Sequence, residues 1–326
     1  MMSESVLRIR DLRVTFNTQM GELKAVRGID VDVAPGEILG GVGESGSGKS
    51  VSFLAAMGLL PSSATITGSV KLDGQELIGS KRKAFRSVRG KSLAMVFQDP
   101  LSALNPVHRV GDQIVEMIQS HQDMNTHDAE KRAVELLEIV GIPQPGERAR
   151  QYPHEFSGGM RQRVVIAMAI ANNPKVLIAD EPTTALDVTV QAQILEVIQK
   201  VQQTFGTAVV LITHDLGVIA RVADSVNVMY AGRNVESGSV QSIFDHPSHP
   251  YTRGLLSSLP HEGVERLQPI AGFPPNMLAP PSGCGFAPRC QFAVDACNAE
   301  LPSLQPFDDL LTSCIRAVDL RIGGRS

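Results

Sequence analysis

The segment from Gly43 to Ser50 restricts most narrowly what this chain can fold into. It reads Gly-Glu-Ser-Gly-Ser-Gly-Lys-Ser and matches the phosphate-binding loop pattern. A polyphosphate has to be wrapped by backbone N–H groups, so such a loop bends tightly and comes close to its ligand. Glycine permits both because it has no Cβ. The pattern therefore predicts a polyphosphate site, with Gly43, Gly46 and Gly48 shaping the loop.

The sequence on either side of the loop supports this interpretation. Residues 37–42 are typical of a short buried strand, and residues 51–57 of a helix whose positive end faces the phosphates. Lys49 is predicted to reach the β- and γ-phosphates, and the Ser50 hydroxyl to bind Mg²⁺. An ordinary glycine turn is the alternative, but the order strand, loop, helix favours a phosphate site. The predicted nucleotide contacts here are Gly43, Glu44, Ser45, Gly46, Ser47, Gly48, Lys49, Ser50 and Val51.

Length and composition predict a large domain with an appendage. The chain has 326 residues, a hydrophobic content of 43% and a formal net charge of −4, which argues weakly against bulk nucleic-acid binding. No apolar run approaches the roughly 18 residues that span a bilayer. The first ten residues mix charged and apolar side chains and lack the apolar core of a signal peptide. We therefore expect the protein to stay in the cytoplasm.

Two parts of the chain predict β-structure by alternation of apolar and polar residues. Residues 6–40 predict strands with a turn near Met20-Gly21, and residues 66–78 a further pair around Asp73-Gly74. Phe16, in the first of these strands, is suited to stack on an adenine ring. An ordinary strand aromatic is the equal alternative. Residues 226–236 predict a hairpin.

The middle of the chain interrupts the β/α rhythm. Residues 92–97 predict a strand that ends at Gln98, a side chain able to bind Mg²⁺ or position water, although most such residues merely cap a strand. Helical signals follow, with Thr126 as the expected N-cap of a helix that stops at Gly141. This stretch predicts a helical subdomain over about residues 99–165.

A second anion-ready helix start follows at residues 157–159. Ser157, Gly158 and Gly159 precede a strongly apolar helical stretch over residues 164–171. One triphosphate does not need two such helix ends in one chain. The second is therefore suited to the nucleotide of another subunit.

Acidic and imidazole side chains follow two further predicted strands. Residues 176–180 form an apolar run that ends in Asp180 and Glu181. Asp180 fits the carboxylate that holds Mg²⁺ in phosphate-loop ATPases, and Glu181 is suited to act as a base for the attacking water. Solvated turn residues are the alternative. His214 follows the strand predicted over residues 208–212 and can donate to a γ-phosphate, although a single His after a strand is usually structural.

In their order along the chain these elements resemble the nucleotide-binding subunits of ABC transporters, over about residues 6–240. The matching elements are the phosphate loop, Gln98, Phe156-Ser157-Gly158-Gly159-Met160, Asp180-Glu181, Ala185-Leu186-Asp187 and His214. The Phe156 and Met160 variants and the segment over residues 244–256 resemble the oligopeptide/dipeptide importer branch. Gly41 departs from the family, which more often has a larger apolar residue there.

The resemblance implies a role for each matched residue. Gln98 would sense the γ-phosphate and couple to membrane subunits, Asp180 would support Mg²⁺, and Glu181 would be the general base. His214 would clamp the γ-phosphate. Ser157, Gly158 and Gly159 would close over a partner's nucleotide, with Asp187 at the dimer junction.

The resemblance also implies the fold. We expect an α/β phosphate-loop ABC-type ATPase core over residues 1–258, with an antiparallel β subdomain and the helical subdomain. A small, irregular, Cys-bearing lobe is expected over residues 259–326.

The implied function is a motor subunit that hydrolyses ATP and drives import of peptides. Its partners would be a second ABC ATPase, a paralogue or itself, two transmembrane permease subunits and, indirectly, a solute-binding protein. It would then lie at the cytoplasmic face of the membrane, without nucleic acid. Alternatives are import of glutathione or nickel chelates, a soluble ABC-type ATPase of repair or translation, and an ATP-binding scaffold without turnover. A single phosphate loop disfavours the soluble ATPase, and the presence of Glu181 disfavours the scaffold.

All four cysteines lie in the proline-rich C-terminal region. Cys284, Cys290, Cys297 and Cys314 are separated by five, six and sixteen residues, without the close pairs of zinc ribbons or ferredoxins. In a reducing compartment such a group suggests a metal before a disulfide. The tail resembles that of peptide-importer ATPases, some of which carry a 4Fe–4S cluster. We expect such a cluster as a structural staple, with zinc or metal-free thiols as alternatives.

Overall fold

The computed structural model describes residues 5–80, 82–184, 186–258 and 270–323. The chain forms two compact units that alternate along the sequence. The first unit contains residues up to Val6, Val33–Ile38 and Ser80–Leu211. The second contains Leu7–Asp32, Leu39–Gly79 and the chain from Ile212 onward. The predicted phosphate loop therefore lies in the second unit, and the predicted acidic strand end in the first.

Three buried strands form the centre of the first unit. They are β6 (Leu93–Val96), β7 (Val176–Asp180) and β8 (Ala208–Ile212), side by side in the order β8, β7, β6. β6 and β7 run parallel, with Val96 opposite Ala179. All residues of β6 and β8 are buried, as expected for strands covered on both faces. Polar side chains that follow these strands therefore emerge at one edge of the sheet.

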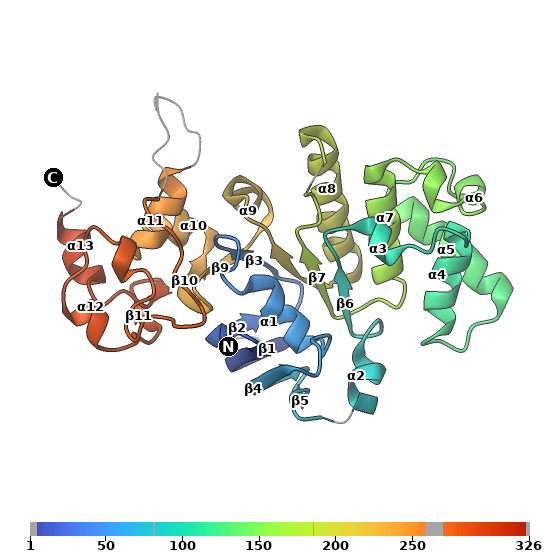
Figure 1. Ribbon diagram of the computed structural model, residues 1–326. Helices are drawn as coiled ribbons and strands as arrows, with labels where there is room; N and C mark the ends of the chain where they lie inside the picture. The colour runs from blue at the N-terminus through green and yellow to red at the C-terminus, as the bar shows by residue number, and fades with distance from the viewer. Residues whose placement is uncertain (1–4, 81, 185, 259–269, 324–326) are drawn as a thin grey trace. The chain divides into compact units, whose positions relative to one another are not determined.

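Helices make up the rest of the first unit. They are α2 (Arg82–Val88), α3 (Pro100–Ala103), α4 (Val110–Gln119), α5 (Thr126–Ile139), α6 (Pro145–Arg148), the 3₁₀ turn η1 (Pro153–Glu155), α7 (Gly158–Ala169) and α8 (Val188–Phe205). The helices α4 to α7 gather in one group, drawn in green in Figure 1. Helix α5 begins at Thr126 because the side chain of Asn125 accepts from the Asp128 N–H. The predicted N-cap was wrong by one residue, since Asn caps as well as Thr.

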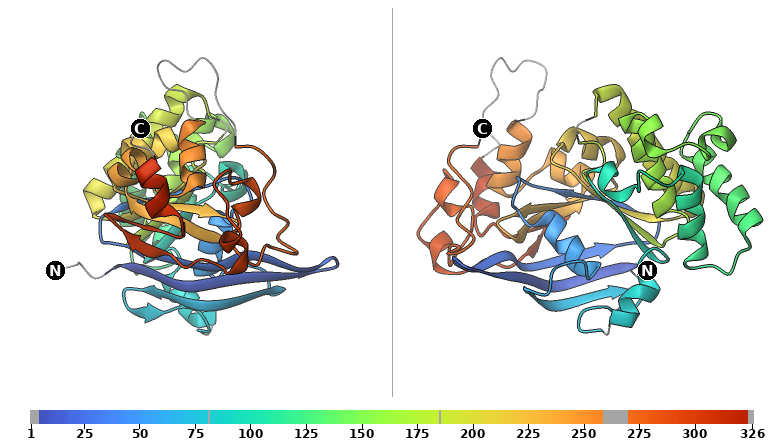
Figure 2. Two further views of the ribbon diagram at one scale, coloured as in Figure 1. Left: turned by 90° about the vertical axis from the view of Figure 1, so that its left-hand side faces the viewer. Right: turned by 45° about the vertical axis from the view of Figure 1, so that its right-hand side comes forward.

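An antiparallel sheet forms one layer of the second unit. Its strands are β1 (Leu7–Thr18), β2 (Gly21–Val33), β4 (Ala64–Leu72) and β5 (Gln75–Glu76), in the order β2, β1, β4, β5. Leu7 of β1 lies opposite Leu72 of β4. The turns fall at Met20 and at Asp73-Gly74, as the alternation predicted. Figure 2 shows the two long blue strands of this sheet lying next to β4.

The second layer of this unit joins the phosphate-loop strand to the C-terminal region. Strand β3 (Ile38–Val42) runs parallel to β9 (Ser225–Tyr230), and β9 pairs antiparallel with β10 (Arg233–Ser239). The sheet then continues through β12 (Leu310–Thr312) to β11 (Gln305–Phe307). The C-terminal region is therefore less irregular than predicted, because two of its strands extend the sheet that holds the phosphate loop.

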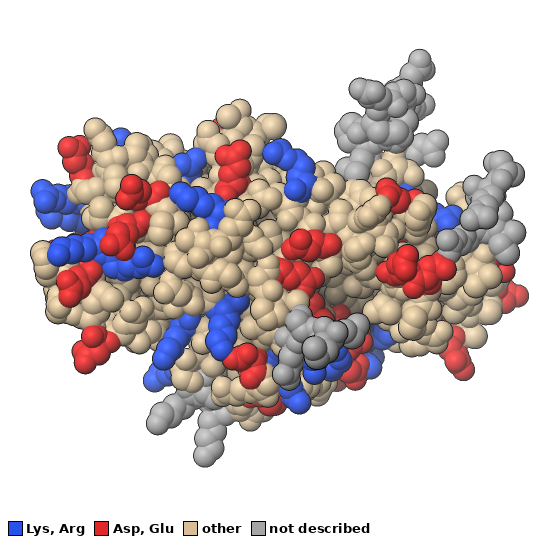
Figure 3. Space-filling view, turned by 180° about the vertical axis from the view of Figure 1, so that it is seen from behind, with Lys and Arg blue, Asp and Glu red and all other residues tan. Residues whose placement is uncertain are grey.

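Short helices complete the second unit. They are α1 (Lys49–Ala56), α9 (Leu216–Val222), α10 (Val240–Asp245), α11 (Pro250–Ser257), η2 (Ala287–Arg289), α12 (Ala296–Ala299) and α13 (Ala317–Gly323). Across the described part of the chain, no helix is both long enough and apolar enough to cross a membrane. On the face drawn in Figure 3, basic and acidic side chains are interspersed.

Candidate nucleotide-binding site

The phosphate loop is held so closely that side chains would not fit at two of its glycines. A Cβ on Gly43 would lie 2.1 Å from the backbone oxygen of Met229, and one on Gly48 would lie 2.8 Å from that of Ala25. Both residues have positive φ angles, 149° and 99°. Gly46 also has positive φ, at 78°, but space around its Cα is open. The loop is therefore fixed between the end of β9 and the strand β2, with its conformation set by glycine.

Lys49 lies inside this loop. Only 6% of it is exposed, and its Nζ donates to the backbone oxygens of Gly43 at 2.6 Å and Glu44 at 3.1 Å. A third bond of 3.3 Å runs to the Ser47 hydroxyl. The ammonium group is thus placed at the concave side of the loop, where the oxygens of a polyphosphate would meet a fixed positive charge.

Helix α1 begins directly at the loop, as the sequence predicted. Gly48 is its N-cap in a left-handed conformation, and the Ser52 hydroxyl donates to the Gly48 oxygen at 2.7 Å. Ser50 and Val51 lie in the first turn, half-buried. The positive end of the α1 dipole therefore lies at the loop, and such a helix start favours a bound anion.

Two further predicted residues lie on neighbouring elements of the same unit. His214 is exposed and follows Thr213, whose N–H donates to the Gly41 oxygen at 3.2 Å. The chain at His214 is thereby tied to the strand that enters the phosphate loop. Phe16 lies half-buried on β1, opposite Ala64 of β4. This position suits both an ordinary role in the sheet and stacking on adenine, so the two interpretations of Phe16 stay open.

Glu44 contacts the C-terminal region rather than the concave side of the loop. Its N–H donates to the Tyr251 hydroxyl at 2.8 Å, and its carboxylate forms two bonds with the Arg289 guanidinium, at 2.7 and 3.0 Å. Tyr251 and Arg289 are therefore residues of the site that sequence reasoning missed. The only available signal was Tyr251, inside the segment over residues 244–256 that carried the family resemblance.

The acidic strand end of the first unit brings three predicted side chains to one edge. Gln98 and Glu181 follow the paired residues Val96 and Ala179, and the Gln98 amide donates to the Glu181 carboxylate at 3.3 Å. The Thr184 hydroxyl, which the sequence did not single out, donates to the same carboxylate oxygen at 2.9 Å. Asp180 is the last residue of β7 and is half-buried. Glu181 has a φ of 47°, which turns the chain sharply after the strand.

The second glycine pair lies at the start of α7. Ser157 caps this helix by accepting from the Met160 N–H at 3.3 Å, and both Ser157 and Gly158 are exposed. Gly159 is buried against α8, so closely that an added Cβ would lie 2.4 Å from the Val190 side chain. Asp187 caps α8 through the Val190 N–H at 2.9 Å. The helix starts predicted to meet a partner are therefore packed together, whereas Ala185 of the same motif lies outside the described residues.

The four cysteines line one small cavity of about 30 Å³ in the C-terminal region. All four are free thiols, and the Cys284 N–H donates to the Cys297 oxygen at 2.8 Å. Burial raises the pKa of Cys284 and Cys290 and raises that of Cys314 to about 11, so these groups are neutral near pH 7. Within the described ranges, no three His, Cys, Asp or Glu side chains are arranged as a metal-ligand set. The four predicted cysteines therefore lie around one cavity, but their side chains are not arranged to bind a metal.

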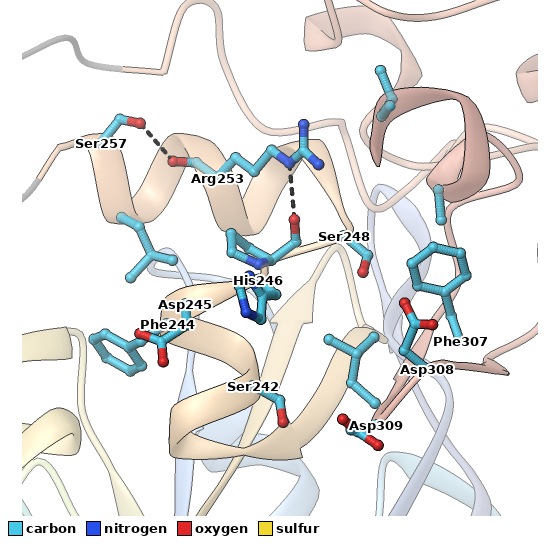
Figure 4. Close-up of a pocket in the computed structure, with 15 residues that line it drawn as sticks. Ser242, Phe244, Asp245, His246, Ser248, Arg253, Ser257, Phe307, Asp308 and Asp309 are labelled. Carbon is cyan, nitrogen blue, oxygen red and sulfur yellow. Dashed lines mark hydrogen bonds between the residues drawn. The ribbon is translucent and has the colours of Figure 1, made fainter. Parts of the chain in front are cut away.

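The segment over residues 244–256 has a buried side and a side that lines a cavity. The cavity measures about 730 Å³, and Phe244, Asp245, His246 and Arg253 line it opposite the turn at Asp308-Asp309. Figure 4 shows Arg253 above this cavity, with its Nε donating to the Pro247 oxygen at 2.9 Å. The buried side includes His249, whose pKa burial lowers to about 3. A neutral imidazole is required there, because its Nδ1 accepts from the Tyr251 N–H.

Comparison with known proteins agrees with this geometry. The ABC transporter family matches residues 26–184, and the oligopeptide/dipeptide transporter C-terminal region matches residues 235–297. The chain is 52% identical to the oligopeptide transport ATP-binding protein OppD of Bacillus subtilis, covering 89% of this chain and 82% of the relative. It is 53% identical to OppD of Mycobacterium tuberculosis over 95% of this chain, but spans about half (52%) of that relative's length.

A solved structure shares the core. The ATP-binding cassette MJ0796, in a dimeric post-hydrolysis state with ADP and Pi, matches with a TM-score of 0.64 at 26% identity, covering 72% of this chain and 98% of that one. Fold and site thus define a phosphate-loop ATPase of the ATP-binding cassette class. The chain belongs to the ABC transporter ATP-binding family, in its oligopeptide/dipeptide branch. The fold and family predictions are confirmed, and the roles of individual residues stay predictions.

Proposed function

We propose that this chain is the ATP-hydrolysing motor subunit of a membrane importer for dipeptides or oligopeptides. The observation that carries the proposal is the buried Lys49 ammonium inside a loop that leaves no room for a Cβ at Gly43 or Gly48. Similarity to peptide-transport ATP-binding proteins extends over most of the chain, including the C-terminal region. The subunit would act at the cytoplasmic face of the membrane, bound to permease subunits.

The loop and the acidic strand end supply the groups that this reaction requires. Lys49 and the N–H groups at the start of α1 would bind the β- and γ-phosphates and stabilise the charge that develops on the γ-phosphoryl group. Glu181 would accept the proton of the attacking water. Its hydrogen bonds from Gln98 and Thr184 orient the carboxylate for that role. His214 would contact the γ-phosphate.

Mg²⁺ is the metal that an ATPase of this class implies, and the residues present suit it. Ser50, Gln98 and Asp180 offer the oxygen ligands that this hard cation prefers. When bound, Mg²⁺ would supply positive charge that offsets the charge of the phosphates.

A second ATPase subunit would complete the site. Ser157 and Gly158 are exposed at the start of α7, a helix end that favours an anion, and Asp187 caps the adjacent helix. We propose that these residues close over the nucleotide of the partner, which is either a paralogue or a second copy. Closure would exclude water and transmit movement to the permease subunits.

The test is reconstitution with the two permease subunits and the solute-binding protein in proteoliposomes. Uptake of labelled dipeptides or oligopeptides should require ATP and should be lost in Lys49→Ala, whose loop lacks the ammonium group. Uptake of glutathione or nickel chelates with no uptake of peptides would replace the proposed substrate class. Full ATPase activity of a strict monomer that never associates with membrane subunits would overturn the proposal.

We also propose that the four thiols of the C-terminal region bind a 4Fe–4S cluster as a structural staple. The supporting observation is that all four cysteines line one cavity together with Phe286, and four thiols are the donor set that such a cluster takes. The raised pKa values of Cys284, Cys290 and Cys314 mean that binding has to displace protons from these three thiols. Protein purified without oxygen should be brown and contain about four iron atoms per chain. Zinc in place of iron, or colourless protein that is folded and active, would remove the cluster.

A further inference from the structure

The phosphate loop is bound to the C-terminal region through one residue of its own motif. Glu44 is the second residue of the loop, and its carboxylate pairs with Arg289, whose side chain is 5% exposed. The geometry is bidentate, with Nη1 to Oε2 at 2.7 Å and Nη2 to Oε1 at 3.0 Å. This two-bond arrangement fixes orientation as well as distance. Glu44, with 25% of its side chain exposed, therefore has a defined position relative to Arg289.

Arg289 is in turn fixed by its surroundings. Its Nε donates to the Ala271 oxygen at 2.9 Å, its Nη2 to the Ile270 oxygen at 3.2 Å, and its Nη1 to the Tyr230 hydroxyl at 3.1 Å. The guanidinium carbon lies 5.7 Å from the centre of the Tyr230 ring and 5.8 Å from that of Phe286. The Glu44 carboxylate raises the pKa of Arg289 further, so the charge is permanent. The guanidinium is thus a rigid donor rather than a mobile surface charge.

A second hydrogen bond holds Glu44 of the phosphate loop, this time through its backbone. The hydroxyl of Tyr251 accepts from the Glu44 N–H at 2.8 Å, and the Tyr251 ring packs against those of Tyr230 and Phe286 at 4.5 and 5.4 Å. Tyr251 is fully buried. The backbone and the carboxylate of Glu44 are therefore both held by residues outside the phosphate-loop motif.

The position of Arg289 links this contact to the thiols. Arg289 ends the turn η2 and directly precedes Cys290, whose N–H donates to the Ala287 oxygen at 3.2 Å. Phe286, which packs on both Tyr251 and Arg289, lines the thiol cavity. Pro274, Pro275 and Met277 of the same region line a small cavity with the loop residues 44–47. Arg289 is therefore joined to the thiol cavity through its neighbour Cys290 and through its contact with Phe286.

We propose that Arg289 is a positioning residue for nucleotide binding, through which the C-terminal thiol region holds the phosphate loop in its binding conformation. Arg289 does not itself touch the nucleotide. Its pairing with Glu44 orders the loop before ATP arrives, so that less conformational entropy is lost on binding. This inference rests on the proposed ATP-binding role of the loop.

The test measures ATP affinity, with a fluorescent ATP analogue, for the full chain and its variants. Arg289→Gln should weaken binding about tenfold, the scale of one charge-assisted pair. Glu44→Gln should do the same. The double variant should be no weaker than either single variant, because both remove one interaction. Arg289→Lys should recover only part of the loss, since Lys keeps the charge but not the bidentate geometry.

Arg316→Gln is the matched control. Arg316 bonds to the Phe292 oxygen and to Asp319 within the same region, and has no contact with the loop among the described residues. Its substitution should lower thermal stability without changing ATP affinity. The inference is overturned if Arg289→Gln binds ATP as tightly as the unaltered chain, or if the effects of Glu44→Gln and Arg289→Gln simply add. Failure of the unaltered chain to bind ATP would instead overturn the proposed function.

Discussion

The amide of Gln98 donates a hydrogen bond of 3.3 Å to the carboxylate of Glu181. The two residues are 83 positions apart and meet because each follows one of two paired parallel strands, β6 and β7. Thr184 donates to the same carboxylate oxygen, Oε2. One oxygen of Glu181 is therefore engaged by two neutral donors, which hold the carboxylate in one orientation. An oriented carboxylate suits the role of general base that we propose for Glu181.

Glu181→Gln should abolish turnover while keeping nucleotide binding. The amide oxygen can still accept from Gln98 or Thr184, so the local structure is retained, but an amide cannot accept the proton of water. We expect the rate of ATP hydrolysis to fall at least 100-fold, on the scale of a lost general base. Steady-state phosphate release and equilibrium binding of ATP measure the two effects. The variant should also accumulate as a dimer in the presence of ATP.

Thr184→Val separates positioning from chemistry. It removes one donor and leaves the carboxylate, so turnover should fall by less than in Glu181→Gln, with unchanged binding of ATP. Turnover of Glu181→Gln equal to that of the unaltered chain would eliminate Glu181 as the base.

Gly43→Ala should prevent formation of the phosphate loop in its present form. The added Cβ would lie 2.1 Å from the Met229 oxygen, a backbone atom that cannot swing aside, and the φ of 149° is unfavourable for Ala. We expect loss of ATP binding together with a destabilisation of more than about 2 kcal/mol. Nucleotide binding and chemical denaturation report the two effects.

Gly21→Ala provides the comparison for Gly43→Ala. It places a Cβ at a positive φ of 119° in open space, at the turn between β1 and β2. Its cost should be the backbone strain alone, about 1 kcal/mol, with ATP affinity unchanged. Equal ATP affinity in Gly43→Ala and the unaltered chain would show that the loop does not hold the phosphates.

Much of the core could be predicted because each motif residue directly follows a strongly apolar run. Runs such as residues 176–180 predict a buried strand, and β6 and β7 are parallel, so Gln98 and Glu181 leave the sheet at one edge. The family resemblance then fixed the order of the elements. Thr184 was not foreseen, because a Thr three residues after an acidic pair has no distinctive pattern.

The contacts of the C-terminal region could not be predicted from the sequence. Arg289 and Glu44 are 245 positions apart, and nothing in the spacing of either indicates a partner. Short strands such as β11 and β12 have three residues each, too few for alternation to be recognised. The expected cluster likewise depended on four cysteines without a recognisable ligand spacing. Such long-range pairings are determined by tertiary packing rather than by local pattern.

Gly159→Ala should disturb the contact between α7 and α8. Its Cβ would lie 2.4 Å from Cγ1 of Val190, a β-branched side chain with little rotamer freedom. We expect a destabilisation of about 1–3 kcal/mol from overpacking. Adding Val190→Ala removes the clashing methyl groups and should restore most of the stability, as measured by thermal or chemical unfolding. Gly158→Ala is the matched control, because its Cβ would come no closer than 3.6 Å to Leu186, which is an ordinary van der Waals contact. If Val190→Ala gave no recovery, the packing explanation would be wrong.

Glu236 should make stability depend on pH between about 4.5 and 7. It is fully buried on β10, where its Oε1 accepts from the N–H groups of Ser248 and His249, and burial raises its pKa to about 7. The folded chain therefore binds this proton more tightly than the unfolded chain, whose carboxyl titrates near 4.5. Protonated Glu236 is compatible with the fold, so stability should be highest below about pH 4.5 for this group and should fall as pH rises to 7.

Glu236→Gln should remove that dependence. The amide keeps an acceptor oxygen for the two N–H groups and carries no charge at any pH, so the variant should be more stable than the unaltered chain at pH 8, by up to about 3 kcal/mol. The difference should shrink toward zero as the pH is lowered to 5. Because His249 is present in both proteins, its opposite dependence, with loss of stability as the pH falls from 6.5 toward 3, cancels in the comparison. Chemical denaturation at a series of pH values measures the difference. A difference that stays constant from pH 5 to 8 would show that Glu236 ionises at an ordinary pKa in the folded protein.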